Sequence, residues 1–267
     1  MKRRGLLLSV ALLMTAPTLA AAQDIVRIAT EGAYPPFNFM DTNGKPAGFD
    51  VDIANALCAE NGWTCEIIVQ DWDGIIPGLI ANKYDLIIAS MGITPQRAEV
   101  VAFSDKYASV PFGFVMSEDL AATVEATPGE GIAQLLAALS GKTIGLVAAT
   151  SSEPYVMDMF ADTVTYKTYQ KMDDALQDLS SGRIDAYADG VVPITENFLK
   201  KDAGKGFTLG GDAFSDPAYF GGGNGIAARK EDSELLAKVN TSLAAILADG
   251  TYAEINDRYF DFNVYGE

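Results

Sequence analysis

The sequence predicts an α/β fold arranged in two lobes. Apolar segments of strand length alternate with segments whose apolar residues recur at helical spacing, which is typical of β-α units with mainly parallel sheets. The expected strands outnumber what one small sheet needs, which favours two sheets. A chain of 267 residues is also long enough for two modest domains.

The expected strands are apolar runs bounded by polar or turn-forming residues. In chain order they are Ile25–Thr30, Cys65–Val69, Asp85–Ala89, Val110–Met116, Thr143–Val147, Val164–Tyr166 and Asp185–Ala188. A hairpin is expected between Phe37–Met40 and Ala47–Phe49, because Asn43-Gly44 is a strong turn signal.

Helices are expected where apolar residues share one helical face. The segments that show this pattern are Phe49 to Leu57, Met172 to Leu179 and Leu235 to Leu247. A polar stretch containing Gly and Pro, from Thr123 to Gly131, precedes a short expected helix at Ile132–Leu139.

Charge and composition exclude several functions. Acidic side chains outnumber basic ones by 36 to 19, and this net charge of −17 argues against a nucleic-acid partner. The chain has no histidine, which excludes Ser-His-Asp and Cys-His nucleophiles and histidine metal sites. The glycine run at Gly221–Gly225 does not match a nucleotide-binding loop, and it indicates a flexible connection or a close backbone approach. We expect no cofactor, no metal and no catalytic residue.

Residues 1–22 are predicted to be a signal peptide. Lys2-Arg3-Arg4 forms a basic start, Leu6–Met14 an apolar core, and Leu19-Ala20-Ala21-Ala22 a small-residue cleavage site before Gln23. The apolar core is too short to span a bilayer comfortably. We expect a soluble protein exported to the periplasm; the alternative is an anchoring helix that stays attached.

The two cysteines, Cys58 and Cys65, lie at the end of an expected helix and the start of an expected strand. In an oxidising compartment, a disulfide across this short connection is expected. A C-x-x-C redox or metal site needs closer spacing and further ligands. We therefore interpret the pair as structural.

Polar and aromatic residues follow the expected strands of the first half, where α/β sheets gather ligands. Glu31 and Tyr34 follow the first strand, and Trp72 follows the second. The small residues Ala89-Ser90-Met91-Gly92 then bring backbone groups close together, and Arg97 offers a fork for a carboxylate. Each residue also has an ordinary interpretation: Glu31 as an exposed carboxylate, the two aromatic residues as packing residues, and Arg97 as part of a surface ion pair.

The second half offers a complementary set. Thr150 and Ser151 follow Val147 at a helix start, where hydroxyl and N–H groups form an anion cradle or a simple helix cap. Asp189 ends a further strand. Each signal is weak alone, but together they place opposite charges at strand ends in both halves.

Over nearly its whole length after the leader, the chain resembles the periplasmic amino-acid-binding proteins of ABC importers, solute-binding protein family 3. The segments that carry the resemblance are Arg27–Phe39, Gly48–Asp52, Trp72–Leu79, Ile93–Arg97, Ala102–Asp105, Gly182–Ala186, Asp249–Tyr252 and Tyr259–Phe260. The closing Phe260–Gly266 and the cysteine pair resemble the lysine/arginine/ornithine-binding branch. Glu31, Trp72 and Ala89–Gly92 resemble the octopine- and nopaline-binding proteins.

The resemblance implies a type II periplasmic-binding-protein fold. Two α/β lobes are joined by two crossover hinge strands and close over a ligand in the cleft. Residues 24–110 plus 218–267 would form lobe 1, and residues 111–217 would form lobe 2. The segment from Ser117 to Ser140 is longer than in compact members of the family.

The resemblance also implies how an amino acid is held. Arg97 would clamp the α-carboxylate, helped by N–H groups near Gly92 and Ser151 and by the Thr150 hydroxyl. Asp189 and the Ser90 carbonyl would accept the α-ammonium.

Tyr34 and Trp72 would wall the side chain, and Glu31 would select a cationic one. The full set of candidate ligand-binding residues is Glu31, Tyr34, Trp72, Ala89, Ser90, Met91, Gly92, Arg97, Val147, Thr150, Ser151 and Asp189.

The implied function is a monomeric receptor that delivers a cationic amino acid of the arginine, lysine or ornithine type to a membrane ABC permease, without catalysis. Ala89 and Gly92 stand where the basic-amino-acid branch tends to have serines, and this leaves an opine as an alternative ligand. A dehydratase of cyclohexadienyl acids on the same fold is the second alternative, with Glu31 as its acid.

Overall fold

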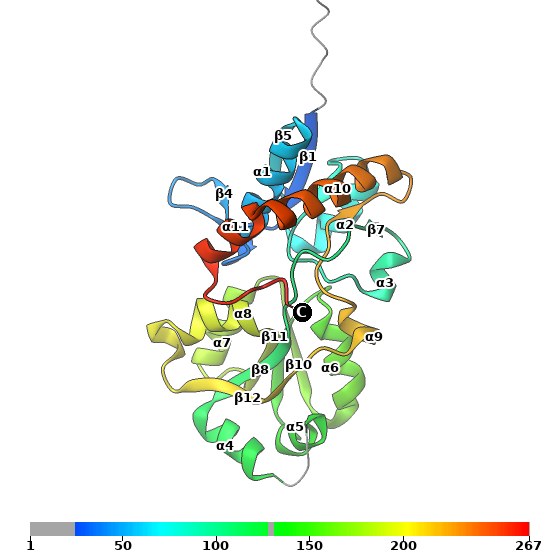
Figure 1. Cartoon of the computed structure of the whole chain (residues 1–267). Coiled ribbons are helices and arrows are strands. Elements are labelled where there is room, and N and C mark those ends of the chain that lie inside the picture. The colour runs from blue at the N-terminus through cyan, green and yellow to red at the C-terminus, as the bar shows by residue number, and fades with distance from the viewer. Residues whose placement is uncertain (1–24, 128–130, 267) are drawn as a thin grey trace, which may run out of the picture.

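The computed structural model describes residues 25–127 and 131–266. Two lobes lie one above the other, each built on its own five-stranded sheet (Figure 1). The strand order is β5-β1-β6-β13-β7 in the first lobe and β10-β9-β11-β8-β12 in the second. The predicted α/β class and the two-lobed architecture are confirmed.

The sheet of the first lobe is mixed. β1 (Ile25–Thr30) pairs in parallel with β5 (Thr64–Val69) and β6 (Leu86–Ile87), whereas β13 (Ala227–Ala228) runs antiparallel to β6 and β7 (Ala102–Phe103). In the second lobe, the edge strands on one side are also antiparallel. The expectation of mainly parallel sheets therefore holds only for part of each sheet.

Helices cover both faces of the first sheet. On one face, α1 (Phe49–Asn61) packs with α10 (Ser233–Asp249) and α11 (Thr251–Tyr259), as Figure 1 shows. On the other face lie α2 (Ile75–Ile80) and the 3₁₀ turn η1 (Trp72–Gly74). The short helix α3 (Pro95–Ala98) follows β6 in the chain.

The predicted hairpin forms at the edge of the first lobe. β3 (Asn38–Met40) pairs antiparallel with β2 (Ala33–Tyr34) and with β4 (Pro46–Ala47). Gly44 supplies the left-handed backbone (φ +72°) that the turn requires. The hairpin follows β1 directly, so it fixes the segment that leaves the sheet at Glu31.

The second sheet is built around β9 (Thr143–Val147), which is parallel to β10 (Thr165–Tyr169) and β11 (Ala186–Gly190). β8 (Phe112–Ser117) runs antiparallel to β11 and β12 (Phe207–Phe214). The helical elements around it are α4 (Glu118–Ala126), α5 (Ile132–Ala138), α6 (Ser152–Phe160), η2 (Ala161–Thr163), α7 (Met172–Ser180), α8 (Val191–Ile194), η3 (Thr195–Leu199), η4 (Asp202–Gly204) and α9 (Pro217–Phe220).

The described parts of the long segment from Ser117 to Ser140 fold as α4 and α5, at the end of the second lobe that lies away from the first (Figure 1). Both helices pack on β12. Leu135 of α5 covers Gly211, where a Cβ atom would meet the leucine side chain at 3.1 Å. These two helices therefore extend the core of the second lobe on the side away from the first lobe.

The two connections between the lobes run side by side. Tyr107 N–H donates to the Asn224 carbonyl (2.9 Å), and Asn224 N–H donates to the Ala108 carbonyl (2.8 Å). At Gly221 a Cβ atom would lie 1.9 Å from the Ile93 carbonyl oxygen, so only glycine fits there. Of the two interpretations of the glycine run, the structure supports the close backbone approach.

The lobe boundaries remain a prediction. Both sheets fall within the expected ranges, but α9 packs against α6 of the second lobe, and the Phe220 ring stacks on Phe112 with centroids 4.1 Å apart. The chain therefore still contacts the second lobe just after residue 217.

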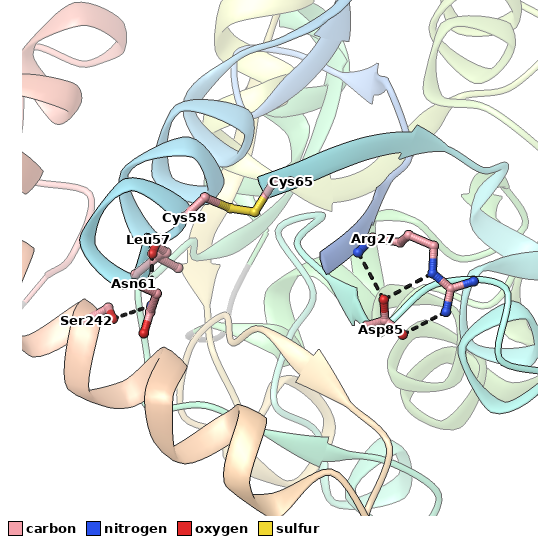
Figure 2. Close-up of a disulfide and its surroundings, with 7 residues drawn as sticks. All are labelled: Arg27, Leu57, Cys58, Asn61, Cys65, Asp85 and Ser242. Carbon is pink, nitrogen blue, oxygen red and sulfur yellow. Dashed lines mark hydrogen bonds and ion pairs between the residues drawn. A yellow bond between two sulfur atoms is a disulfide. The ribbon is translucent and has the colours of Figure 1, made fainter. Parts of the chain in front are cut away.

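The predicted disulfide between Cys58 and Cys65 is present and joins the end of α1 to the start of β5 (Figure 2). Nearby, the Asn61 side chain donates to the Ser242 hydroxyl (2.5 Å) and ties α1 to α10. The predicted signal peptide lies outside the described residues. No helix in the described ranges is long and apolar enough to cross a membrane.

Candidate functional site

A cavity lies between the two lobes and is lined from both of them. Its lining residues are Glu31, Ala33, Tyr34, Trp72, Ala89, Ser90, Gly92 and Arg97 from the first lobe, and Phe112, Val147, Thr150, Ser151, Met172 and Asp189 from the second. The structure thus brings every candidate residue except Met91 to one cavity.

Met91 does not line the cavity because its side chain is buried in the apolar cluster beneath the sheet. Three lining residues were not anticipated. Ala33 carries no distinctive chemistry, and Phe112 and Met172 begin apolar patterns that indicate a strand and a helix core. In the sequence, nothing distinguishes an apolar residue facing a cavity from one facing a core.

Asp189 is a buried carboxylate at the centre of the site. It is 3% exposed and accepts hydrogen bonds from the Tyr34 hydroxyl (2.8 Å), the Gly190 N–H (2.7 Å) and the Tyr187 hydroxyl. Burial raises the pKa of Asp189 above its usual value, and these three donors limit the rise. Since Tyr34 belongs to the first lobe and Asp189 to the second, their bond joins the lobes across the cavity.

Glu31 is the second carboxylate of the cavity. It follows β1, where the chain leaves the sheet at its carboxyl end. Burial raises its pKa to about 7, and the negative charges of Asp189 and Asp71 add to this rise, whereas Lys171 opposes it. A cation placed beside Glu31 would lower this pKa and favour the ionised form.

Arg97 supplies the cation. It lies in α3, whose N-terminus is capped by the Thr94 hydroxyl. Its guanidinium donates to the Gly92 carbonyl (3.1 Å) and, across the cleft, to the Ala149 carbonyl (3.1 Å). Burial lowers its pKa to about 10. Within the described residues it makes no ion pair, so the cavity holds a desolvated cation.

Trp72 is placed by η1 directly after β5. The Arg97 guanidinium carbon lies 5.2 Å from the centre of its ring, within the range of a cation–π interaction. The indole N–H donates to the Ala149 carbonyl (3.2 Å), which also accepts from Arg97. The aromatic wall and the cation are therefore held by the same backbone oxygen of the second lobe.

The second-lobe side of Arg97 is the start of α6. Ala149 has a left-handed backbone (φ +60°), which turns the chain from β9 into the helix. The Thr150 hydroxyl donates to the Val147 carbonyl (2.7 Å), and Ser151 is buried. The first N–H groups of a helix have no partner within it, so this turn offers donors to an anion.

The site therefore presents one guanidinium and two carboxylates to a shared, largely buried space. Such an arrangement suits a small ligand that carries both charges. No group of three or more cysteine, aspartate and glutamate side chains in the described ranges could hold a metal ion.

Two lobes with a charged cavity between them define a class of protein, the two-lobed solute receptors. The comparison with known families agrees. Residues 26–262 match the model of the bacterial extracellular solute-binding proteins, family 3, and the chain belongs to this family.

Relatives cover the whole chain. The L-arginine-binding protein of Pseudomonas aeruginosa is 41% identical in an alignment of 268 positions that covers 100% of this chain and 99% of the relative. The lysine/arginine/ornithine-binding periplasmic protein of Escherichia coli is 37% identical in an alignment of 270 positions that covers both chains fully. The octopine-binding periplasmic protein of Rhizobium meliloti is 32% identical in an alignment of 287 positions, gaps included, that covers 95% of this chain and 96% of that protein.

Solved structures agree as well. A Salmonella typhimurium periplasmic binding protein described as highly arginine-specific has a TM-score of 0.78 at 31% identity, covering 90% of this chain and 100% of its own. An ancestral amino-acid-binding protein, described as a precursor of cyclohexadienyl dehydratase, has a TM-score of 0.75 at 29% identity, covering 89% and 95%. The resemblance stated from the sequence is confirmed.

Proposed function

We propose that this chain binds a cationic L-amino acid, arginine foremost, between its lobes and delivers it to an ABC permease from the periplasm. One observation carries the proposal: Arg97, Asp189 and Glu31 all line one cavity between the lobes. A cationic amino acid carries one carboxylate and two cationic groups, and so matches these three charges.

Arg97 is the partner for the α-carboxylate. It is half-buried, its pKa is lowered by desolvation, and it has no ion pair within the described residues. Such a cation gains strongly from a carboxylate. The adjacent start of α6, with Thr150 and Ser151, adds hydroxyl and N–H donors.

Removal of the leader and transfer of the ligand to a permease are further parts of the proposal. Membership of the solute-binding family supports both.

Asp189 is the partner for the α-ammonium. The carboxylate has about four acceptor positions, and the three donors described above leave room for one more hydrogen bond. The ammonium would offset the burial that raises the pKa of this group.

Glu31 is the partner for the cationic side chain. A guanidinium can donate two parallel hydrogen bonds to one carboxylate, which an ammonium cannot match in geometry. This favours arginine over lysine and ornithine. The names of the curated relatives from Pseudomonas aeruginosa and Escherichia coli support the same ligand class.

An opine is the second candidate, because a relative binds octopine. The glycine at position 92, where the basic-amino-acid branch tends to have a serine, does not by itself make room for an opine, however. A Cβ atom there would meet the Phe220 carbonyl oxygen at 3.2 Å and the Arg97 guanidinium at 3.6 Å. The missing side chain at Gly92 thus serves close packing of the cleft, and we favour a single amino acid.

Calorimetry on the chain exported with its own leader tests the proposal. L-arginine should bind with one-to-one stoichiometry and more tightly than L-lysine, L-ornithine, L-histidine or octopine. Tighter binding of octopine would support the second candidate, and absence of heat with all five would contradict the proposal. Incubation with a cyclohexadienyl acid, followed by product analysis, covers the dehydratase alternative.

A further inference from the structure

Two hydrogen-bond chains from the walls of the cavity converge on one buried carboxylate, Asp50. In the first, the Gly32 N–H donates to Asn38 Oδ1 (2.8 Å), and Asn38 Nδ2 donates to Asp50 Oδ2 (2.8 Å). In the second, the Ser90 N–H donates to the Tyr107 hydroxyl (2.9 Å), which donates to Asp50 Oδ1 (2.7 Å).

Both chains begin at the binding site. Gly32 directly follows Glu31, and Ser90 itself lines the cavity. Ser90 has a left-handed backbone (φ +49°), which is unfavourable for a residue with a side chain and persists only where neighbours hold it. Its hydroxyl also accepts from the Asn224 side chain (2.6 Å) in the second connection between the lobes.

Asp50 lies in the first turn of α1, with no exposed surface and outside the cavity lining. Burial raises its pKa to about 6, while the hydrogen bonds from Tyr107 and Asn38 oppose this rise. The hydrogen bonds that Asp50 accepts thus compensate for the burial of its carboxylate in an apolar core.

The direction of both chains is fixed at their outer ends. A backbone N–H can only donate, so Asn38 must turn its oxygen to Gly32 and its amide to Asp50. For the same reason the Tyr107 oxygen accepts from Ser90 and its proton points to Asp50. The residue at position 50 must therefore accept on both oxygens, which suits an ionised carboxylate, since it has no proton of its own to donate.

We propose that ionised Asp50 is a positioning residue of the ligand site: it holds the Glu31-Gly32 turn and Ser90 in their binding geometry through Asn38 and Tyr107. The inference rests on the proposed amino-acid binding in this cavity. It assigns a role in ligand affinity to a side chain that does not reach the ligand.

Asp50→Asn should break one chain whichever way its amide turns. If the amide faces Asn38, two NH₂ groups meet; if it faces Tyr107, the hydroxyl proton loses its acceptor. L-arginine should then bind about tenfold more weakly, because a mispaired buried group disturbs one wall of the cavity.

A swap restores both chains. In the double variant Asn38→Asp with Asp50→Asn, the carboxylate at 38 accepts from the Gly32 N–H and from the amide at 50, whose oxygen accepts from Tyr107. Charge and composition are unchanged, and affinity should return to within about threefold of wild type. Tyr107→Phe, which cuts only the Ser90 chain, should weaken binding about as much as Asp50→Asn.

The readouts are calorimetry with L-arginine and hydrogen exchange of the Gly32 and Ser90 amides in the ligand-free protein. The swap should restore affinity and the protection of both amides.

Unchanged affinity and protection in Asp50→Asn, or a folded swap variant without recovery, would overturn the inference. If wild type does not bind L-arginine, the proposed function fails, while amide protection still tests the network. If Asp50→Asn does not fold, the comparison of Tyr107→Phe with wild type decides.

Discussion

The Tyr34 hydroxyl donates to Asp189 Oδ1 at 2.8 Å, joining residues that lie 155 positions apart in the chain and on different lobes. The carboxylate assigned to the α-ammonium is therefore also a point of contact between the lobes. If Asp189 binds the ligand as proposed, ligand binding and contact between the lobes share this group, so changes at Tyr34 should affect both.

Tyr34→Phe keeps the aromatic wall and removes the bond between the lobes. We expect L-arginine affinity to fall several-fold, by about the worth of one hydrogen bond to a charged group. Tyr187→Phe is the matched control, because its hydroxyl bonds Asp189 from within the second lobe. Calorimetry measures the affinity of both variants for L-arginine. Small-angle scattering with L-arginine should show weaker closure of the lobes for Tyr34→Phe only. Equal closure in both variants would contradict a role for the Tyr34 bond.

Arg97→Ala should weaken L-arginine binding at least tenfold, since a desolvated carboxylate loses its partner at a cost of about 2–5 kcal/mol. Arg97→Lys keeps the charge but loses the fork geometry, and it should recover only part of the affinity. Calorimetry measures both variants. Wild-type affinity in Arg97→Ala would show that the α-carboxylate binds elsewhere.

Affinity for L-arginine should rise with pH through about 7, the pKa to which burial raises Glu31. The guanidinium needs the ionised carboxylate, and binding below this pH must release the proton. Glu31→Gln should bind L-arginine more weakly and without this pH dependence, while its affinity for neutral L-glutamine changes less. Equal losses for both ligands would remove Glu31 from the side-chain pocket.

The same raised pKa affects stability in the opposite sense. Between the usual pKa of a glutamate and about 7, the folded chain holds a proton at Glu31 that the unfolded chain has lost. This group's contribution to the free energy of unfolding therefore falls as pH rises across that window. In ligand-free protein, Glu31→Gln should be more stable than wild type at pH 8 and similar at pH 4, as denaturant unfolding can measure. The reverse order would contradict the raised pKa.

Replacing Cys58 and Cys65 with serine should lower the free energy of unfolding by about 2.5 kcal/mol, the loop-closure entropy for so short a loop. Neither residue lines the cavity, so L-arginine affinity should be unchanged. Denaturant unfolding and calorimetry check the two halves of this prediction. A large loss of affinity would indicate that the disulfide shapes the site.

Strands that are marked by a local sequence pattern were predicted correctly. Ile25–Thr30 and Thr143–Val147 are strands over the expected residues, because each is an apolar run ended by polar or turn residues. Strand direction is not encoded in such runs, so β8 was predicted as a strand but its antiparallel direction was not. β13, only two residues long, was not predicted as a strand.

The site was predictable in part, because charged and aromatic residues at strand ends stand out. The bond from Tyr34 to Asp189 and the proposed positioning role of Asp50 could not be predicted in this way. A tyrosine in a proline-rich turn and an aspartate at a helix start have ordinary local explanations, and only the packing of distant segments reveals their partners.

A crystal structure of the chain with L-arginine would locate all three charged groups of the ligand at once. We expect the ligand's α-carboxylate against Arg97, its α-ammonium on Asp189 and its guanidinium on Glu31. A ligand bound in the reverse orientation, with its guanidinium on Asp189, or outside this cavity, would contradict this expectation.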